Sequence, residues 1–466
     1  MKKTLSILAL IILIIAALPF VTGLIAKNRF ENLATQIQHQ NPNIQLKTKY
    51  HLGWLSSRAV LSWSLNTPTN TAMPTLQHPA IIHHGPFILF KDEEGKTHFF
   101  FGIALLQVQL PELAQNSVFS IDFKKKIFSN FIYIPFNLHY DFRLHTQLQA
   151  TVNFNRIPLL SLNLDNLGLN ANFTHNFNQV QGQFLLENLN LDSQNNGYLA
   201  IPRIEINIDH HLEQSVYLGN ESIHIPLIDL SIPSLIQLKM QTLASSFAGH
   251  REKNDDVDYT LDLSVNNILY DNQSYGPFAF DFEIRDLNFK VLSEVEQKLQ
   301  QYVNAKPDQA NNASELQTTL EKDMRTLLPT LIQPNTEFNL KQLDFSVPSG
   351  SIRSNGVLHF LKTPKMLSLD ALMQASELQY HLAASQSLTQ LLIQSVLAKS
   401  LGIVDNQWDP AKILAQLLRL GLVKENNGFY YIDIRVKQSV PYVNELPFNP
   451  AVLQKIQWIA PQTVKQ

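Results

Sequence analysis

Histidine pairs are the first residues of this chain whose side chains could bind a metal ion or transfer protons. They occur at His83-His84 and His210-His211, both within apolar, strand-like stretches. Neighbouring residues of a strand point to opposite faces, so such a pair does not readily bind one ion. The patterns His-x-His and His-Glu-x-x-His do not occur in the sequence. We therefore expect turn and surface histidines and no metal site.

Two charged clusters could bind ions or lipid head groups. Asp255, Asp256 and Asp258 offer the oxygen ligands that calcium prefers, but the spacing and closing Glu of an EF-hand are missing. A solvated loop is the expected structure there. The basic run 124–126 has two interpretations, a contact with anionic lipid head groups or a polar strand edge that resists pairing.

Nucleophilic and phosphate-binding motifs are missing from the sequence. The chain has no cysteine, which excludes disulfides, thiol nucleophiles and cysteine-ligated metal centres. It has no Gly-x-Ser-x-Gly and no Walker A motif. Ser56-Ser57 is expected at a turn. We predict a non-enzymatic protein with no catalytic residues, no cofactor and no metal, and we disfavour a hydrolase assembled from residues distant in the sequence.

The charge balance gives no reason to expect nucleic acid. The formal net charge is −3, and charged residues make up only 16% of the chain. A nucleic-acid-binding protein typically carries a basic surface. The low charge is typical of a β-rich extracytoplasmic protein whose surface is built from Asn, Gln, Ser and Thr.

The N-terminal run is the strongest single signal. Thr4 to Ala26 contains no charged residue, with Lys2-Lys3 before it and Lys27 after it. As a helix it would span roughly 34 Å, enough for a hydrocarbon core of about 30 Å. We predict an uncleaved signal anchor at residues 1–26, with the body outside the inner membrane of a Gram-negative cell. A cleaved signal peptide and a cytoplasmic body are the alternatives.

Hydrophobic periodicity divides the remaining chain into three regions. Residues 27–42 carry an apolar stripe (Phe30, Leu33, Ala34, Ile37) that predicts a stalk helix ending at Asn41-Pro42. Residues 43–290 show repeated alternation, as in Ile204, Ile206 and Ile208, with short Asn- and Gly-rich turns. This pattern predicts an antiparallel meander in a β-rich periplasmic region.

The C-terminal region, residues 291–466, is expected to be α+β and to continue the same sheet. Leucine stripes predict a helical hairpin around a linker at 304–312, a long helix over about 375–401 and a shorter helix over 410–420. Strands are expected at 337–347, 352–360 and 428–437. The predicted fold class is α+β, mainly antiparallel β, with an elongated curved sheet, several helices and one preceding transmembrane helix.

Aromatic-rich stretches occur at 87–90, 99–101 and 128–133. Such stretches are typical of a sheet that is buried on both faces, and equally of a sheet whose concave face holds acyl chains. The sequence leaves both interpretations open.

Several motifs, taken in order, resemble one bacterial family. Tyr50-His51-Leu52-Gly53-Trp54-Leu55-Ser56-Ser57-Arg58-Ala59 is similar to the N-terminal motif of the YdgA-like family of unknown function (DUF945), and His84-Gly85-Pro86-Phe87 to its His-Gly-Pro element. Further matching segments are 274–278, 285–288, 334–360 and 426–431 with Asn444. The resemblance implies an inner-membrane anchor and a periplasmic body, with no activity or cofactor attached.

A looser likeness of architecture to AsmA-type proteins implies a long sheet associated with lipid handling. We therefore expect a cell-envelope protein whose curved β-sheet binds lipid or another apolar ligand. Its expected partners are the inner membrane and lipid or envelope proteins. The alternative is a non-enzymatic assembly or interaction protein that binds other envelope proteins through its sheet edges.

Overall fold

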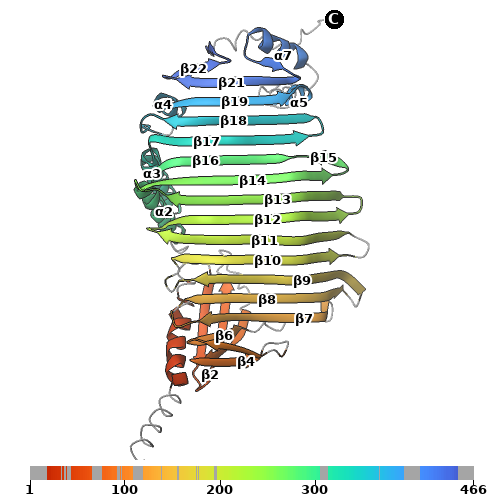
Figure 1. Cartoon of the computed structure of the whole chain (residues 1–466), viewed down its shortest axis with the longest axis vertical. Helices are drawn as coiled ribbons and strands as arrows, with labels where there is room; N and C mark the ends of the chain where they lie inside the picture. Colours follow the sequence, from red (N-terminus) through yellow and green to blue (C-terminus); the bar gives the residue numbers. More distant parts are fainter. Residues whose placement is uncertain are drawn as a thin grey trace, which may run out of the picture. The chain divides into compact units, whose positions relative to one another are not determined.

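The structure is a computed structural model of the whole chain (Figure 1). It describes residues 18–449 except for 33, 36, 37, 39–43, 66–75, 92–94, 96, 109–118, 138, 155, 156, 175, 177, 194–196, 305–312, 367 and 393–409. The chain divides into two compact units. The first comprises residues 1–213 with the short segments 231–233 and 301–313, and the second comprises the remainder. This division lies upstream of residue 290, where the sequence predicts a region boundary.

The first unit is an antiparallel β-structure. Its strands are β1 (Ile44–His51), β2 (Ser56–Leu65), β3 (Leu76–His84), β4 (Phe87–Lys91), β5 (Thr97–Phe101), β6 (Ala104–Val108), β7 (Phe119–Ile134), β8 (Tyr140–Phe154), β9 (Ile157–Phe173), β10 (Gln179–Asp192) and β11 (Tyr198–Glu213). They pair antiparallel in the order β1-β2-β3-β6-β7-β8-β9-β10-β11, while β4 and β5 form a separate hairpin. Short connections between consecutive strands explain this meander.

The second unit combines a second antiparallel meander with helices. Its strands are β12 (Val216–Ile232), β13 (Ile236–Arg251), β14 (Asp256–Tyr270), β15 (Gln273–Tyr275), β16 (Phe278–Asn288), β17 (Ile332–Val347), β18 (Gly350–Phe360), β19 (Ser376–Ser385), β20 (Lys424–Asn426), β21 (Phe429–Lys437), β22 (Val440–Val443) and β23 (Leu446–Pro447). Its helices are α2 (Phe289–Asn304), α3 (Ala313–Leu331), α4 (Leu369–Ala375), α5 (Gln386–Leu392) and α7 (Pro410–Arg419). From β13 onward the long strands pair in the order β13-β14-β16-β17-β18-β19-β21.

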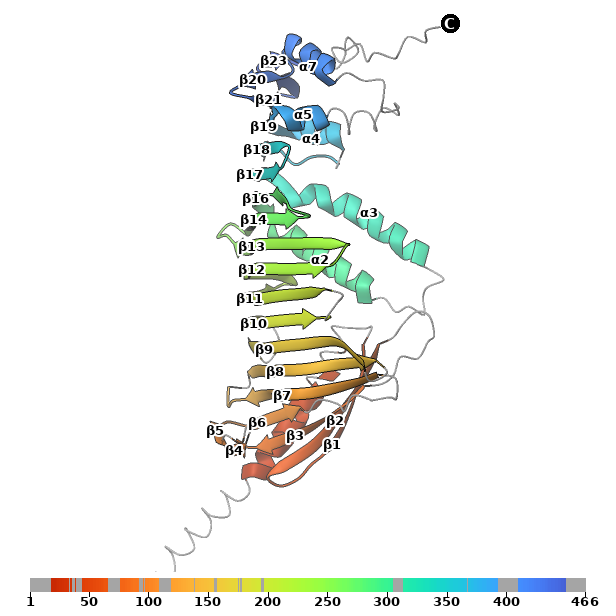
Figure 2. The ribbon, with the colours of Figure 1, turned by 90° about the vertical axis from the view of Figure 1, so that its right-hand side faces the viewer.

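The prediction of a mainly antiparallel β fold with several helices is therefore confirmed for the described chain. The predicted hairpin of helices is also confirmed as α2 and α3, which lie on one side of the strands of the second unit (Figure 2). That both regions share one elongated curved sheet stays a prediction.

The predicted long helix at 375–401 is wrong over its first part. Ser376–Ser385 forms strand β19, which pairs on both sides with β18 and β21. Leu378, Tyr380, Leu382 and Ala384 share one face of the sheet, and Gln379 and His381 lie between them, so the period is two. Leucine, alanine and glutamine have high helix propensity, and tertiary pairing outweighs it here. Residues 393–409 lie outside the described part.

A helix at residues 18–32 packs on the first unit. Thr22, Ala26, Phe30 and Ala34 recur every fourth residue and are all buried. Ala26 and Phe30 join a core cluster with Ala59, Ile82 and Ile132 from strands β2, β3 and β7. Part of the predicted stalk stripe therefore packs on the sheet, whereas Leu33 and Ile37 lie outside the described residues.

The predicted anchor at 1–26 lies mostly outside the described residues, of which only 18–26 are described and helical. Within the part of the chain that the structure describes, no helix has the length and apolar character needed to span a membrane.

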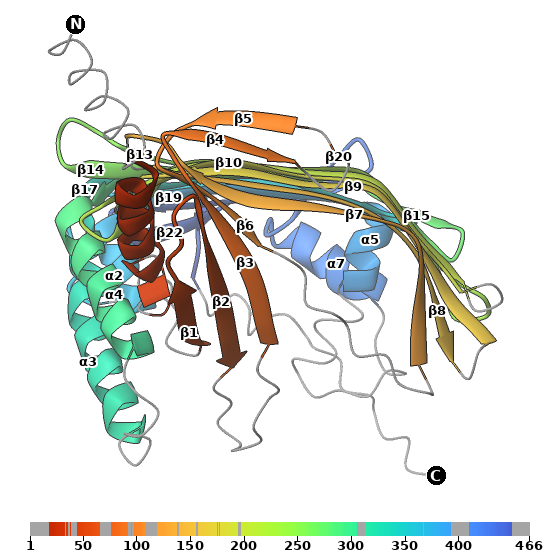
Figure 3. The same cartoon turned by 90° about the horizontal axis from the view of Figure 1, so that it is seen from below.

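The β4–β5 hairpin lies on the face of the first unit's sheet opposite the N-terminal helix (Figure 3). Ile88 and Phe90 are buried against Leu105 of β6, and this cluster includes the half-buried Phe100 of β5. Exposed and covered residues alternate strictly along both strands of this aromatic-rich segment. The hairpin is therefore a two-sided element with one covered face and one open face.

Truncating a core residue of α2 should destabilise this helix. Phe289 is fully buried in a cluster with Val216, Leu218 and Val257, and the Arg251 guanidinium lies 3.9 Å from its ring centroid. We expect Phe289→Ala to lower the free energy of opening of α2 by about 3–5 kcal/mol. Hydrogen exchange with mass spectrometry measures this quantity.

The control substitution is Leu299→Ala, since Leu299 is an exposed residue on the same helix. The opening free energy of α2 should fall by well under half as much in Leu299→Ala as in Phe289→Ala. Equal losses at the two positions would contradict the assigned packing of α2.

Candidate functional site

One face of the first unit's sheet is apolar over several adjacent strands. Leu144, Leu169, Phe184 and Ile206 are directly paired across β8, β9, β10 and β11. The next row contains Thr146, Leu167, Leu186 and Ile204. All these side chains are half-buried, and neither row contains a charged residue. We call these two rows the first apolar face.

The opposite face of the same strands is polar. Arg143, Asn170, Gln183 and Asn207 form one row there. Arg203 pairs with Glu187 at 3.3 Å and with Glu205 at 2.9 Å. Hydrogen bonds from Arg203 and Asn207 lower the pKa of the Glu205 carboxylate. The period of two therefore places most polar side chains on this side, where Leu185, paired with Glu205, is an apolar exception.

The second unit repeats this separation over seven strands. Phe247, Leu261, Phe282, Leu340, Gly356, Tyr380 and Ile434 are paired in one row from β13 to β21. The adjacent row contains Leu263, Phe280, Leu343, the buried Ser354 and Leu382. These two rows are the second apolar face.

Among the described residues, helices cover the second apolar face toward its margins. Phe289 and Leu292 of α2 pack on Val257 and Tyr259. Leu372 of α4 packs near Phe360 and Phe338, and Ile413 and Leu414 of α7 pack on Tyr430. In the rows between these clusters the apolar side chains are half-buried or, for Leu261, exposed. The middle of the face is therefore partly open apolar surface.

Gly356 is the one residue in these rows without a side chain, and Tyr380 fills its place. A Cβ on Gly356 would lie 2.6 Å from Cδ2 of the Tyr380 ring. The ring therefore lies across the glycine, and the apolar surface continues over this position.

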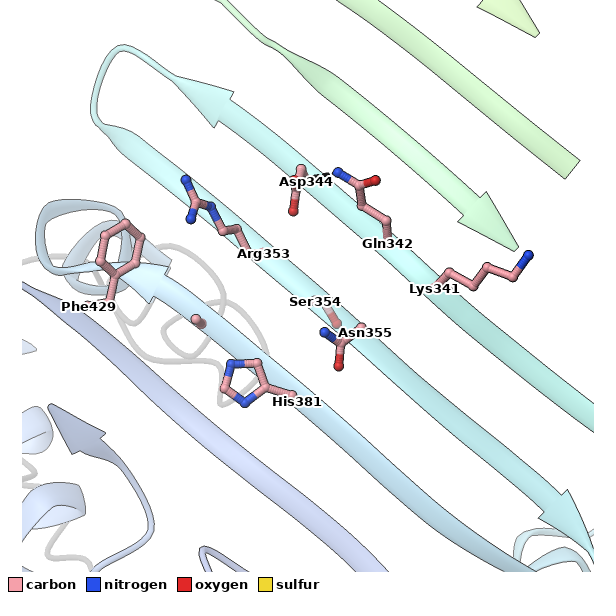
Figure 4. A pocket seen from close by; sticks show the side chains of 9 residues that line it. Lys341, Gln342, Asp344, Arg353, Ser354, Asn355, His381 and Phe429 are labelled. Atoms are coloured by element: carbon pink, nitrogen blue, oxygen red, sulfur yellow. Dashed lines mark hydrogen bonds between the residues drawn. The ribbon is translucent and has the colours of Figure 1, made fainter. Parts of the chain in front are cut away.

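The polar side of the second unit carries a shallow pocket of about 420 Å³ (Figure 4). Lys341, Asp344, Arg353, Asn355 and His381 line it. Its charges largely neutralise one another: His381 Nδ1 lies 2.7 Å from Asp433 Oδ1, and Lys341 Nζ lies 3.3 Å from Glu283 Oε2. Burial opposes ionisation of Glu283, but hydrogen bonds from Arg285 and Lys341 outweigh it and lower the pKa of this carboxyl.

The structure separates most of the residues that the sequence singles out. His83 and His84 point to opposite faces, as predicted: His84 is buried, and the His83 ring lies 5.9 Å from Phe90 of the hairpin. His211 pairs with Glu213 at 3.4 Å. Asp255 lies in the turn between β13 and β14, where it pairs with Arg251 at 2.7 Å. In the described part of the chain, no three His, Cys, Asp or Glu residues cluster as metal ligands would.

Residues 124–126 lie in strand β7, where Lys125 and Lys126 pair with β8. Strand β6 pairs with β7 only further along, at residues 131–134. A register shift between Phe123 and Lys125 marks a bulge there. Within the described residues, the basic run is therefore paired on one side only, as the strand-edge interpretation predicts. Lys124 is exposed, as a bulge residue in a polar run can be.

Ser57 and His84 are brought together, which the sequence does not reveal. Ser57 lies at the start of strand β2 and not in the predicted turn. Its Oγ lies 2.8 Å from His84 Nε2. His84 Nδ1 lies 3.0 Å from the Trp54 carbonyl oxygen, so Nδ1 carries the proton and Ser57 donates to Nε2. The Gly53 amide in turn donates to Ser57 Oγ at 3.2 Å.

This serine–histidine pair is closed over by the N-terminal helix. Ser57 and His84 are 1% and 3% exposed. A Cβ on Gly23 would lie 2.5 Å from atoms of the His84 ring, so the helix backbone passes directly over the imidazole. Thr22 Oγ1 also donates to the Gly85 carbonyl at 2.8 Å. The geometry assigns this cluster, which we call the helix junction, to positioning the helix on the sheet.

The two segments that form the helix junction are those that carry the family resemblance. Residues 50–59 contribute Gly53, Trp54 and Ser57, and residues 84–87 contribute His84 and Gly85. A histidine in an otherwise apolar strand and a glycine within a helical run are the only sequence signals of this contact.

Adding a methyl group at Gly23 should weaken the helix junction. Gly→Ala in a helix interior normally stabilises by about 1 kcal/mol. Here the methyl group would overlap His84, and we expect a loss of about 1–3 kcal/mol in the opening free energy of residues 18–32. Hydrogen exchange at these residues measures it. Asn28→Ala, at an exposed position of the same helix, should be neutral or slightly stabilising. A higher opening free energy of residues 18–32 in Gly23→Ala would refute the close contact between the helix and His84.

Acid should also weaken the helix junction. Burial lowers the pKa of His84, although the Trp54 and Pro19 carbonyls oppose the shift. Below the ordinary pKa of about 6.5, the unfolded chain takes up a proton that the folded chain resists. The stabilisation is therefore complete above about pH 6.5 and declines as the pH falls.

The measurement is amide protection of residues 18–32 over a pH series. His84→Gln should flatten the pH dependence. The variant His83→Gln is a matched control, because burial also lowers the pKa of His83. It should retain the pH dependence of the helix, because His83 lies on the opposite face of the strand. A helix whose protection is independent of pH in the wild-type chain would contradict the role of His84.

Comparison with known proteins gives one relationship. No curated protein and no solved structure matches the chain. The family described as bacterial protein of unknown function (DUF945) matches residues 1–451, which include the helix junction and both apolar faces. The match confirms the family resemblance of the sequence motifs, whereas the likeness to AsmA-type proteins stays an analogy. The chain belongs to the DUF945 family of bacterial proteins.

Proposed function

We propose that this protein is held at the inner membrane by its N-terminal run and binds lipid acyl chains, or another apolar ligand, on the apolar faces of its periplasmic β-structure. One observation carries the proposal: uncharged rows of half-buried apolar side chains continue across four strands in the first unit and seven in the second. The opposite rows are polar.

The size of the second apolar face suits an acyl chain. Strands are spaced about 4.8 Å apart, so a row across seven strands extends for roughly 29 Å. Each methylene group transferred from water to such a surface contributes about 0.8 kcal/mol. A chain lying on half-buried Phe280, Phe282 and Leu340 would complete the burial that the sheet begins. The free energy comes from apolar contact alone.

The side chains of the rows favour hydrocarbon chains as a class of ligand and do not select one compound. Specific recognition of a small molecule needs a few fixed polar groups among apolar ones. The rows instead offer mainly phenylalanine, leucine and isoleucine, with Thr146, Ser354 and Tyr380 as the polar exceptions among those named. We therefore assign selectivity to hydrocarbon chains and not to a particular head group.

The proposed location follows from the N-terminal sequence. Thr4 to Ala26 is uncharged and long enough to span a bilayer, and a short basic head with a long following body is typical of a signal anchor. The helix at 18–32 continues from this run directly onto the sheet of the first unit. This arrangement would place an apolar sheet face close to its source of lipid.

Polar substitutions on the first apolar face should reduce lipid binding. The paired residues Leu186 and Ile204 lie in the same row as Thr146, so threonine is tolerated there. We expect the double substitution Leu186→Thr and Ile204→Thr to lower the acyl lipid that co-purifies with the full chain, by about tenfold if it removes about 1.4 kcal/mol. Native mass spectrometry after mild detergent extraction measures the bound lipid.

The control for this experiment lies on the polar side of the same two strands. Gln183 and Asn207 are also directly paired. The double substitution Gln183→Thr and Asn207→Thr should leave the bound lipid unchanged. A wild-type chain without co-purifying lipid, or equal losses in the two variants, would refute the proposal.

A further inference from the structure

The open face of the β4–β5 hairpin is the most exposed apolar surface that the proposed function leaves unused. Phe87, Leu89, Phe99 and Phe101 are 55–68% exposed. Phe87 pairs with Phe101 and Leu89 with Phe99, so the four form one compact patch. Phe136 extends it, since its ring lies 5.1 Å from that of Phe101. Large exposed apolar patches mark interaction sites.

A second exposed apolar group lies at the turn before β2. Trp54 and Leu55 are 57% and 67% exposed. The Leu55 carbonyl accepts a hydrogen bond from the His84 amide at 2.9 Å, and His84 lies just before the Gly85-Pro86 step that leads into β4. The turn and the base of the hairpin are therefore neighbours.

The Trp54-Leu55 turn and the base of the hairpin border the start of the described N-terminal helix. The Phe20 ring lies 5.8 Å from that of Trp54, and Thr22 donates to the Gly85 carbonyl. Phe20, Val21, Leu24 and Ile25 of this helix are exposed apolar residues. The described helix, which follows an uncharged stretch of sequence, thus begins beside the hairpin base.

We infer that the hairpin patch, the Trp54-Leu55 turn and the exposed side of the N-terminal helix together contact the bilayer surface next to the anchor. This inference rests on the anchor of the proposed function but not on lipid binding by the apolar faces. Exposed aromatic and leucine side chains beside a membrane-spanning run are typical of the membrane interface.

Polarity along the hairpin gives the contact a direction. At its base, Phe87 faces Phe101, whereas toward its tip Lys91 faces Thr97. The tip sequence contains Asp92, Glu93 and Glu94. Carboxylates are repelled by the anionic surface of a bilayer. The base of the hairpin therefore contacts lipid while its tip remains in water.

Single thiols provide the test, because the chain has no cysteine. Full-length Phe99→Cys and Leu89→Cys, labelled with the fluorophore NBD, are placed in nanodiscs of phosphatidylethanolamine and phosphatidylglycerol with or without doxyl-labelled lipid. We expect the doxyl lipid to quench both labels by about twofold or more. Leu235→Cys, at an exposed leucine in the turn after β12, and Lys91→Cys should change little.

Three outcomes would overturn the inference. Labels at 89 and 99 that are no more quenched than the label at 235 would show that the patch does not touch lipid. Thiol crosslinks between two copies at position 99, without quenching, would assign the patch to self-association. A chain that does not enter nanodiscs would refute the anchor itself.

The lipid-binding proposal can be separated from this inference. In the Leu186→Thr and Ile204→Thr variant, loss of bound lipid should leave the quenching at position 99 intact. Quenching that disappears together with the bound lipid would overturn the inference of a separate membrane contact.

Discussion

An antiparallel sheet with one apolar face needs something to cover that face, and this constraint governs the structure. In both units the alternation of strands places leucine, isoleucine and phenylalanine on one side and Asn, Gln, Asp and Arg on the other. Helices α2, α4 and α7 cover the second apolar face at its margins. Half-buried rows between them retain apolar surface, and hydrocarbon is the partner that such surface favours.

The helix junction ties this sheet to the N-terminal run. A neutral, buried His84 accepts from Ser57 and donates to the Trp54 carbonyl, while Gly23 lets the helix pass over its ring. Every polar atom of the imidazole is thus satisfied within the protein, as burial of a polar group requires. The contact resembles a nucleophile–base pair in distance alone, because it is covered by the helix that it holds. If the N-terminal run is the proposed membrane anchor, such a junction would fix the distance between the membrane and the first apolar face.

Much of the β-structure is predictable from sequence because period-two patterns are local. The strands around Ile204 and Leu167, the α2–α3 hairpin and α7 all follow from spacing alone. Strand β19 does not, since its Leu, Gln and Ala residues favour a helix until β18 and β21 pair with them. The helix junction is equally hidden, because Gly23, Ser57 and His84 meet only through tertiary packing. The openness of the apolar faces depends on which helices cover them, and no local pattern encodes that.

A density map of the full chain extracted with native lipids tests the central claim most directly. The account predicts elongated, hydrocarbon-like density along the rows through Leu186 and Ile204 and through Phe282 and Leu340, with none over the polar row through Gln183 and Asn207. Apolar faces covered throughout by the protein's own side chains, or open faces with no density in a map that resolves side chains, would contradict it.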